Sequence, residues 1–283
     1  MKEVRIIGVP EHFNLPWHMA IEEGAFENCG IDLQWQDIPE GTGKMCQMLK
    51  DGETDLAIIL TEGIVKSIIE GNPAQIVQTY IATPLHWGIH VGAQSRFKTI
   101  SELNGASAAI SRFSSGSHLM AYVNAQNEGW DASKLSFEVV NNLDGAVEAL
   151  TEGAADYFMW EHFTTKPLVD KGVFRRLGDC PTPWPCFVIA ATDKFIAEQP
   201  GALRHVLNTI NAYTAEFRQI PSIDRTLANR YGQRIEDIRE WLSMTRWSQE
   251  QLDGAVVDQV QETLHSLGLI DKKVAKEALL KIF

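Results

Sequence analysis

Ionisable side chains that could bind a small molecule stand where expected strands give way to loops. Glu62 and Glu161 follow two apolar runs, and Arg112 begins a loop after a third run. An inward-facing arginine would hold a carboxylate, sulfonate or phosphate through two hydrogen bonds, whereas inward-facing glutamates would favour a cationic or amine-bearing ring. Each residue could instead form a surface ion pair, which contributes little stability. These residue types predict contact with a small molecule and leave its charge open.

Two loops of small residues each precede an expected helix. The N–H groups at a helix N-terminus bind anions, but Ser and Thr side chains also satisfy the same groups as simple caps. Neither loop is a Walker or Rossmann fingerprint, because the first has only two of the three glycines. Ligand contact and capping are therefore the two alternatives for these loops. Their residues are Gly41, Thr42 and Gly43 in the first loop, and Ser114, Ser115, Gly116 and Ser117 in the second.

Tryptophans stand at similar positions, at expected strand ends and in a proline-rich segment. Indoles at such loops commonly sandwich flat or apolar ligands while polar groups set the orientation. We expect Trp17, Trp160 and Trp184 to line a cleft, and we assign the same role less firmly to Trp87. The alternative for each of them is a place in the hydrophobic core.

Patterns for metal binding and for nucleophilic catalysis are not found in the sequence. The four cysteines form no CxxC pair and no zinc-type spacing with histidine, and there is no Gly-x-Ser-x-Gly motif. We therefore expect no metal, no catalytic residue, and cysteines that are reduced and mostly buried. A nucleophilic Cys186 served by a histidine is the alternative. Hydrogen-bonding or solvated roles are expected for the loop histidines, which are His12, His18, His118 and His162.

Composition limits the class of protein. The chain has 283 residues and a formal net charge of −12, and this length predicts about two domains with cores that need no disulfides. The negative charge argues against nucleic acid or anionic lipid as a partner. No apolar stretch approaches the ~18 residues of a membrane span, and no export signal is visible. With unpaired cysteines, this predicts a cytoplasmic protein; the alternative is a periplasmic or lipid-anchored protein whose export segment has been removed.

Strand-like apolar runs alternate with helical segments over the first two thirds of the chain. This alternation predicts mainly parallel sheets with helices on both faces. From about residue 193 to 283 the pattern becomes almost wholly helical and predicts three or four helices. One apolar stripe at i, i+3, i+4 spacing is formed by Leu203, Val206, Leu207, Ile210, Tyr213 and Phe217. The expected strands are residues 4–9, 31–38, 56–60, 75–81, 87–91, 106–110, 135–140 and 155–160.

One segment is repeated within the chain. Residues 49–55 (LKDGETD) recur as residues 150–156 (LTEGAAD), sharing a Leu, an acid, a Gly and an Asp. The Gly is expected to end a helix in the left-handed conformation and the Asp to start the next strand. The repeat predicts two similar α/β lobes. Because open α/β sheets bind ligands at the carboxyl ends of their strands, the segments after residues 60 and 160 should face a cleft between the lobes.

Five motifs together resemble the type II periplasmic binding protein fold. They also resemble the branch of that fold that holds alkanesulfonate- and thiamine-precursor-binding proteins and the fungal thiamine pyrimidine synthases. Residues 160–167 (WEHFTTKP) resemble a subgroup of that branch without export signals, found in fungi and bacteria, and the resemblance covers the whole chain. The five motifs are residues 8–26 (GVPEHFNLPWHMAIEEGAF), 40–43 (EGTG), 60–63 (LTEG), 111–118 (SRFSSGSH) and 182–187 (TPWPCF).

The resemblance implies an α/β fold of two Rossmann-like lobes joined by two crossing strands. Lobe one would comprise residues 1–88 and 186–283, with the C-terminal helices packed on it, and lobe two residues 89–185. The crossings would lie near residues 87–90 and 184–186, where Pro181, Pro183 and Pro185 suit a connecting segment.

The same resemblance implies a solute-binding protein, like the substrate-binding components of ABC transporters, whose lobes close on a small molecule. The implied partners are a heteroaromatic, sulfonate or carboxylate ligand and an ABC permease, with no cofactor. One alternative is a cytoplasmic enzyme related to the thiamine pyrimidine synthases, with pyridoxal phosphate on a lysine. Lys44 and Lys66 are nearest to that role, and Cys186 stands alone where those enzymes have a Cys-rich run. A ligand sensor is the other alternative. The predicted ligand-binding residues are Phe13, Asn14, Trp17, His18, Gly41, Thr42, Gly43, Thr61, Glu62, Arg112, Ser114, Ser115, Ser117, His118, Trp160, Glu161 and Trp184.

Overall fold

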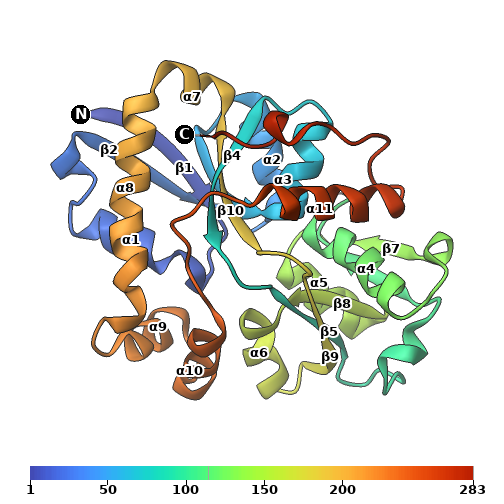
Figure 1. Cartoon of the computed structure of the whole chain (residues 1–283). Coiled ribbons are helices and arrows are strands. Elements are labelled where there is room, and N and C mark those ends of the chain that lie inside the picture. The colour runs from blue at the N-terminus through green and yellow to red at the C-terminus, as the bar shows by residue number, and fades with distance from the viewer. Residues whose placement is uncertain (114, 283) are drawn as a thin grey trace. The chain divides into compact units, whose positions relative to one another are not determined.

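The computed structural model describes residues 1–113 and 115–282 and is an α/β structure (Figure 1). The chain forms two compact units: the first comprises Met1–Thr83 and Trp184–Phe283, and the second comprises Pro84–Pro183. These limits fall five residues before the expected boundary at 88 and two residues before the one at 185. The first limit is earlier because β5 (His86–Gly92) pairs along its whole length with β9 (Phe174–Pro181) of the second unit.

The first unit is built on a five-stranded sheet. Its strands are β1 (Lys2–Gly8), β2 (Ile31–Asp37), β3 (Leu56–Leu60), β4 (Ala74–Ile81) and β10 (Phe187–Thr192), in the order β2-β1-β3-β10-β4. β1 pairs in parallel with β2 and β3, whereas β10 is antiparallel to β3 and β4. Every residue of β3 and β10 is buried. Burial on both faces of the sheet explains why these two strands are largely continuous apolar runs.

Helices cover both sides of this sheet. Helix α8 (Pro200–Glu216) packs with α1 (Leu15–Glu22) on one side, and α11 (Gly254–Ser266) packs with α3 (Thr61–Ile69) on the other (Figure 1). The apolar stripe predicted for α8 is buried at Leu203, Val206, Leu207 and Ile210, so helical spacing alone located this packing face. The other helices of the unit are α2 (Thr42–Asp51), α7 (Asp193–Glu198), α9 (Ile223–Tyr231) and α10 (Ile235–Met244).

The expectation of almost continuous helix after residue 193 is wrong in two stretches, which run along the edge of β4. Residues 246–250 exchange backbone hydrogen bonds with β4. Near the C-terminus, the N–H of Ile76 donates to the Leu279 carbonyl at 2.8 Å, and the N–H of Lys281 donates to the Ile76 carbonyl at 2.9 Å. An uncovered edge strand offers its unpaired backbone groups to other chains. These extended stretches therefore protect the edge of the sheet.

The second unit has a five-stranded sheet of its own, in the order β7-β6-β8-β5-β9. In addition to β5 and β9 it contains β6 (Ser107–Ile110), β7 (Ser136–Val139) and β8 (Tyr157–Glu161), with helices α4 (Gly116–Asn127), α5 (Leu143–Glu152) and α6 (His162–Asp170). β6 is parallel to β7 and β8, but β5 is antiparallel to β8 and β9. Four of the five strands in each described sheet run in the same direction, so the prediction of mainly parallel sheets is confirmed; the exceptions are β10 in the first unit and β5 in the second. In each unit, the strand that follows a change of unit enters its sheet in the reverse direction.

The internal repeat has a clear structural basis. Gly52 and Gly153 end α2 and α5 with φ of 70° and 78°, in the left-handed region. Asp55 then accepts the backbone N–H of Arg5 on β1 at 2.9 Å, and Asp156 accepts that of Ser107 on β6 at 2.8 Å. In both units the aspartate ties the start of one strand to its parallel neighbour. The predicted roles of Gly and Asp in the repeat are confirmed.

Replacing Asp55 by Ala should lower the free energy of unfolding by about 2 kcal/mol, as expected for the loss of charge-assisted hydrogen bonds. The substitution removes the bonds to the Arg5 backbone and to the Arg5 guanidinium, whose Nη2 lies 2.9 Å from Oδ1. Urea unfolding followed by circular dichroism would measure the change. Asp51→Ala is the matched control, because Asp51 is exposed nearby and bonds only to Gln47 among the contacts described; an equal loss in both variants would contradict the assigned role.

Candidate functional site in the first unit

The carboxyl end of β3 brings Glu62 next to Trp184. Thr61, the first residue of α3, donates its N–H to the Cys186 carbonyl at 3.0 Å and its hydroxyl to the Pro185 carbonyl at 2.5 Å. These bonds hold the chain that leads into β10 against the start of α3. As a result, the indole Nε1 of Trp184 donates to Oε2 of Glu62 at 2.8 Å. Two residues predicted separately from the sequence thus form one buried pair.

The carboxyl group of Glu62 is unusual in its burial. Its side chain is fully buried, and its Oε1 has no hydrogen-bond partner among the described residues. Burial disfavours the charged form and raises the pKa of Glu62 to about 7, against the opposing effects of its backbone hydrogen bond and the Trp184 indole. Among the described residues, Oε1 of Glu62 is the only carboxylate oxygen that is buried without a hydrogen-bond partner, and such an atom calls for an explanation. Glu62 is therefore the strongest candidate for a ligand contact.

The loop before α2 lies directly beside Glu62. A Cβ placed on Gly63 would come within 2.2 Å of Cγ2 of Thr42, so the first turns of α2 and α3 are in close contact. Gly41 adopts φ 77° and ψ −161°, a region that is open almost only to glycine. Neither α2 nor α3 has a side-chain cap at its N-terminus. In this unit the structure gives no support to the capping alternative, and it brings together Gly41, Thr42, Gly43, Thr61, Glu62 and Trp184.

In the second unit, the corresponding serine and glutamate side chains already accept hydrogen bonds from backbone N–H groups. Oγ of Ser115 accepts the N–H of His118 at 3.3 Å, and Oγ of Ser117 accepts the N–H of Ser111 at 3.0 Å. Oε2 of Glu161 accepts the N–H of Thr164 at 2.6 Å and so caps α6. Burial also raises the pKa of the Glu161 carboxyl. Bonds from backbone N–H groups account for these side chains without a ligand; Ser114 lies outside the described residues.

Replacing Glu161 by Ala should therefore reduce the free energy of unfolding by about 1 kcal/mol, the usual cost of a lost N-cap. The N–H of Thr164 would lose its acceptor. Thermal unfolding of the variant would measure the loss, and Glu161→Gln serves as its control because the amide oxygen can still accept the bond. A Gln variant as unstable as the Ala variant would show that capping is not the role of this side chain.

The N-terminal aromatic residues are placed mainly by core packing. Trp17 is fully buried, stacked on Phe26 with ring centroids 5.9 Å apart. Phe13 lies between Phe187 and Trp241, with ring centroids 5.2 and 5.1 Å away. Core packing thus accounts for Trp17 and Phe13, the alternative already considered for the tryptophans.

Two polar residues beside these rings complete the N-terminal group. Asn14 donates to the Val9 carbonyl at 2.8 Å, while its Oδ1 has no partner among the described residues. His18 is half-buried with its ring edge on Trp35, and burial lowers its pKa. Asn14 therefore also has a buried acceptor that no described residue uses.

In the second unit, the predicted aromatic residues are held by contacts with other aromatic rings. Trp160 stacks on Phe158 at 5.3 Å and meets Trp87 edge-on at 6.3 Å. The ring of His118 packs against Phe137 at 4.7 Å, and Arg112 is half-buried. Trp160 is partly exposed, and its ring is held by the rings of Phe158 and Trp87.

Pyridoxal phosphate would need a lysine amine available for a Schiff base. The amine of Lys66 is paired with Glu70 one turn along α3, and Lys44 lies in the first turns of α2. Lys66 therefore does not fit that role. Within residues 1–113 and 115–282, no group of three or more His, Cys, Asp or Glu side chains is placed to hold a metal ion. In the same range no helix is long and apolar enough to cross a membrane.

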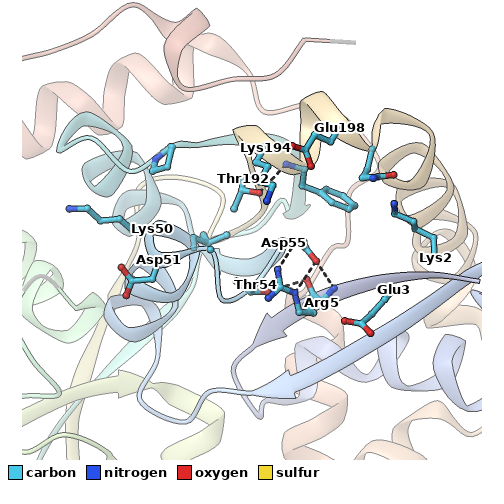
Figure 2. Close-up of a pocket in the computed structure, with 15 residues that line it drawn as sticks. Lys2, Glu3, Arg5, Lys50, Asp51, Thr54, Asp55, Thr192, Lys194 and Glu198 are labelled. Atoms are coloured by element: carbon cyan, nitrogen blue, oxygen red, sulfur yellow. Dashed lines mark hydrogen bonds and ion pairs between the residues drawn. The ribbon is translucent and has the colours of Figure 1, made fainter.

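Two surface cavities accompany the internal repeat rather than this site. One, of about 630 Å³, opens beside the Arg5–Asp55 pair, as Figure 2 shows, and the other, of about 660 Å³, lies beside Asp156. The lining of the first contains equal numbers of basic and acidic side chains: Lys2, Arg5, Lys50, Lys194, Glu3, Asp51, Asp55 and Glu198. Both lie where the repeated aspartates start their strands, and Glu62 lines neither of them. Volume alone therefore does not mark the candidate site.

The pairing of Glu62 with Trp184 was missed by reasoning from the sequence. The two residues are 122 positions apart, and the sequence contains no local signal that joins them. The only indication available was that Thr61 and Glu62 end one strand while Trp184 precedes another apolar run.

Comparison with known proteins identifies the fold. Residues 87–180 match the family model described as Ca3427-like PBP, and a comparison with curated protein sequences found no significant match. The structure is similar to the CA3427 gene product of Candida albicans, which defines a family with the generic periplasmic binding protein fold; the TM-score is 0.90, the identity 22%, and the match covers 99% of this chain and 96% of that chain.

Two further solved structures belong to binding proteins. The alkanesulfonate-binding protein SsuA from Xanthomonas axonopodis pv. citri, bound to MOPS, matches with a TM-score of 0.83 and 16% identity over 99% of this chain and 98% of that chain. A zinc-bound ligand-binding component of an ABC-type import system from Staphylococcus aureus matches with a TM-score of 0.78 and 12% identity over 99% and 97%. The resemblance inferred from the sequence motifs is confirmed: this chain has the periplasmic binding protein fold, and residues 87–180 match its Ca3427-like family.

Proposed function

We propose that this protein is a solute-binding protein that holds one small organic molecule. The observation that carries the proposal is the likeness over 99% of the chain to a binding protein whose structure was determined with a small molecule bound. The pairing of Glu62 with Trp184 supports it, because it supplies an unused buried acceptor beside two helix N-termini that have no side-chain cap. The ligand would be trapped as the units close about the connecting segments. An ABC permease is the proposed partner.

Ligand screening tests this proposal directly. Thermal-shift and tryptophan-fluorescence measurements against sulfonates, taurine, thiamine precursors and aromatic acids should yield at least one ligand, with a smaller radius of gyration in small-angle scattering when it is bound. Trp184→Phe is the control for fluorescence, because loss of that indole should reduce the signal. A protein that binds no member of the panel and shows no closure would contradict the proposal.

A further inference from the structure

We infer that Glu62 is the polar anchor of this site and that it selects a ligand with a protonated or N–H-bearing nitrogen, such as an amine, an amidine or an amino-substituted heteroaromatic ring. The inference rests on the proposed function and specifies its ligand class. The sequence left open whether the ligand is an anion or an amine-bearing molecule, and this inference favours the amine-bearing molecule.

The two oxygens of Glu62 are in different situations. Oε2 accepts the indole N–H of Trp184 at 2.8 Å, and Trp184 lies in the segment that Thr61 binds through the Pro185 carbonyl. The carboxyl group is therefore held in one orientation. Oε1 is buried and has no partner among the described residues. One acceptor position is thus fixed in space and unused.

No basic side chain of the same helix serves this oxygen. Lys66 lies one turn further along α3, but its amine is paired with Glu70. Among the described contacts, no ion pair to Glu62 occurs either. A buried acceptor without a donor costs about 1–3 kcal/mol, and an N–H group of a ligand would remove that cost. A cationic donor would add the strength of a charge-assisted hydrogen bond in a water-poor site.

Protonation of Glu62 does not supply the hydrogen-bond partner that its carboxyl group lacks. A neutral acid has a hydroxyl that needs an acceptor, and no described residue offers one to Oε1. An anionic ligand group at Oε1 would meet a like charge when the carboxyl is ionised, and one hydroxyl donor when it is neutral. Glu161, in contrast, is accounted for by its bond to Thr164, so the second unit contains no equivalent unused oxygen on that side chain. The acceptor role therefore belongs to Glu62.

The experiment compares wild-type protein with Glu62→Gln and with Glu161→Gln as the matched control. The probes are benzylamine, benzamidine, 4-aminopyrimidine and 5-(aminomethyl)pyrimidine, set against benzoate, benzenesulfonate and taurine, together with the small molecules released from the purified protein by denaturation and identified by mass spectrometry. Affinities are measured by isothermal titration. We expect binders to carry a donor nitrogen, and Glu62→Gln to weaken them at least about tenfold, the effect of losing one charge-assisted bond. Glu161→Gln should leave their affinities unchanged.

Outcomes for the inference and for the proposed function are distinguishable. Ligands that bind equally to wild type and Glu62→Gln, or binders that are anions without a donor nitrogen, would overturn the inference and leave solute binding intact. A protein that binds no probe and releases no small molecule would overturn both. Trp184→Phe provides a second variant: it frees Oε2 and should weaken the same nitrogen ligands, whereas unchanged affinity there would also count against the anchor role.

Discussion

Replacing Glu62 by Gln should raise the free energy of unfolding by about 3 kcal/mol at pH 8 and leave it nearly unchanged at pH 4.5. Burial raises the pKa of Glu62 from 4.5 to about 7. Between these values the folded protein binds more protons at this site than the unfolded chain does. The free energy of unfolding of the wild type therefore falls as pH rises through this window. This loss, which comes from ionising the buried carboxyl, reaches its full size above pH 7. Glutamine has the shape of the neutral acid and does not titrate, so it avoids this loss.

Urea unfolding at a series of pH values between 4 and 9 would measure this difference. Trp184→Phe is the informative companion, because the indole N–H lowers the pKa of Glu62 and its loss should move the fall in stability to higher pH. A Glu62→Gln variant that is less stable than the wild type at pH 8 would contradict the description of this carboxyl as a buried group without sufficient partners.

Replacing His12 by Phe should have the opposite pH dependence and a larger effect. Between pH 6.5 and pH 3 the His12 ring should cost the wild type about 5 kcal/mol of its free energy of unfolding, and the Phe variant should not show this loss. The His12 ring is buried beside the rings of Phe13 at 5.0 Å and Trp241 at 4.2 Å. Burial lowers its pKa from 6.5 to about 3. In this window the unfolded chain binds more protons, so wild-type stability is fully present above pH 6.5 and is lost as pH falls toward 3.

Phenylalanine suits this position because Nε2 of His12 has no hydrogen-bond partner among the described residues. The variant should retain near-neutral stability and unfold at a lower pH than the wild type in an acid titration followed by near-ultraviolet circular dichroism. His205→Phe is the control, since His205 is exposed on α8 and its replacement should not alter the acid transition. Identical acid transitions in wild type and His12→Phe would contradict the prediction.

The secondary structure was predictable where one local pattern determines it. The apolar run of β3 and the periodic stripe of α8 are such cases, and both were located from residue spacing. Strand β9 was not predicted, because its residues Arg175, Arg176 and Asp179 interrupt any apolar run. Strand β10 was also absent from the expected strands, and the direction of β5 was missed. Direction depends on pairing with strands far away in the sequence, and neither propensity nor periodicity reports it.

The candidate site was predictable in its residue types and not in its partners. Strand ends and small-residue loops pointed to Thr42, Glu62 and Trp184, since ligands of α/β sheets gather at such ends. The sequence treated Glu62 and Glu161 alike, and the structure separates them by one contact, the bond from Thr164 to Glu161. Whether a carboxyl is already satisfied is decided by tertiary contacts. That information is what distinguishes a helix cap from a candidate ligand anchor.

The position of β10 in the first sheet sets the order in which the two units can be completed during synthesis. β10 stands between β3 and β4, yet it is made only after the whole of Pro84–Pro183 has been synthesised. The second unit is continuous in sequence and can complete its sheet before β10, the strand that pairs with both β3 and β4, has been synthesised. On the ribosome, the lobe that starts first is therefore the one that finishes last, and its nascent strands must avoid mispairing until β10 arrives.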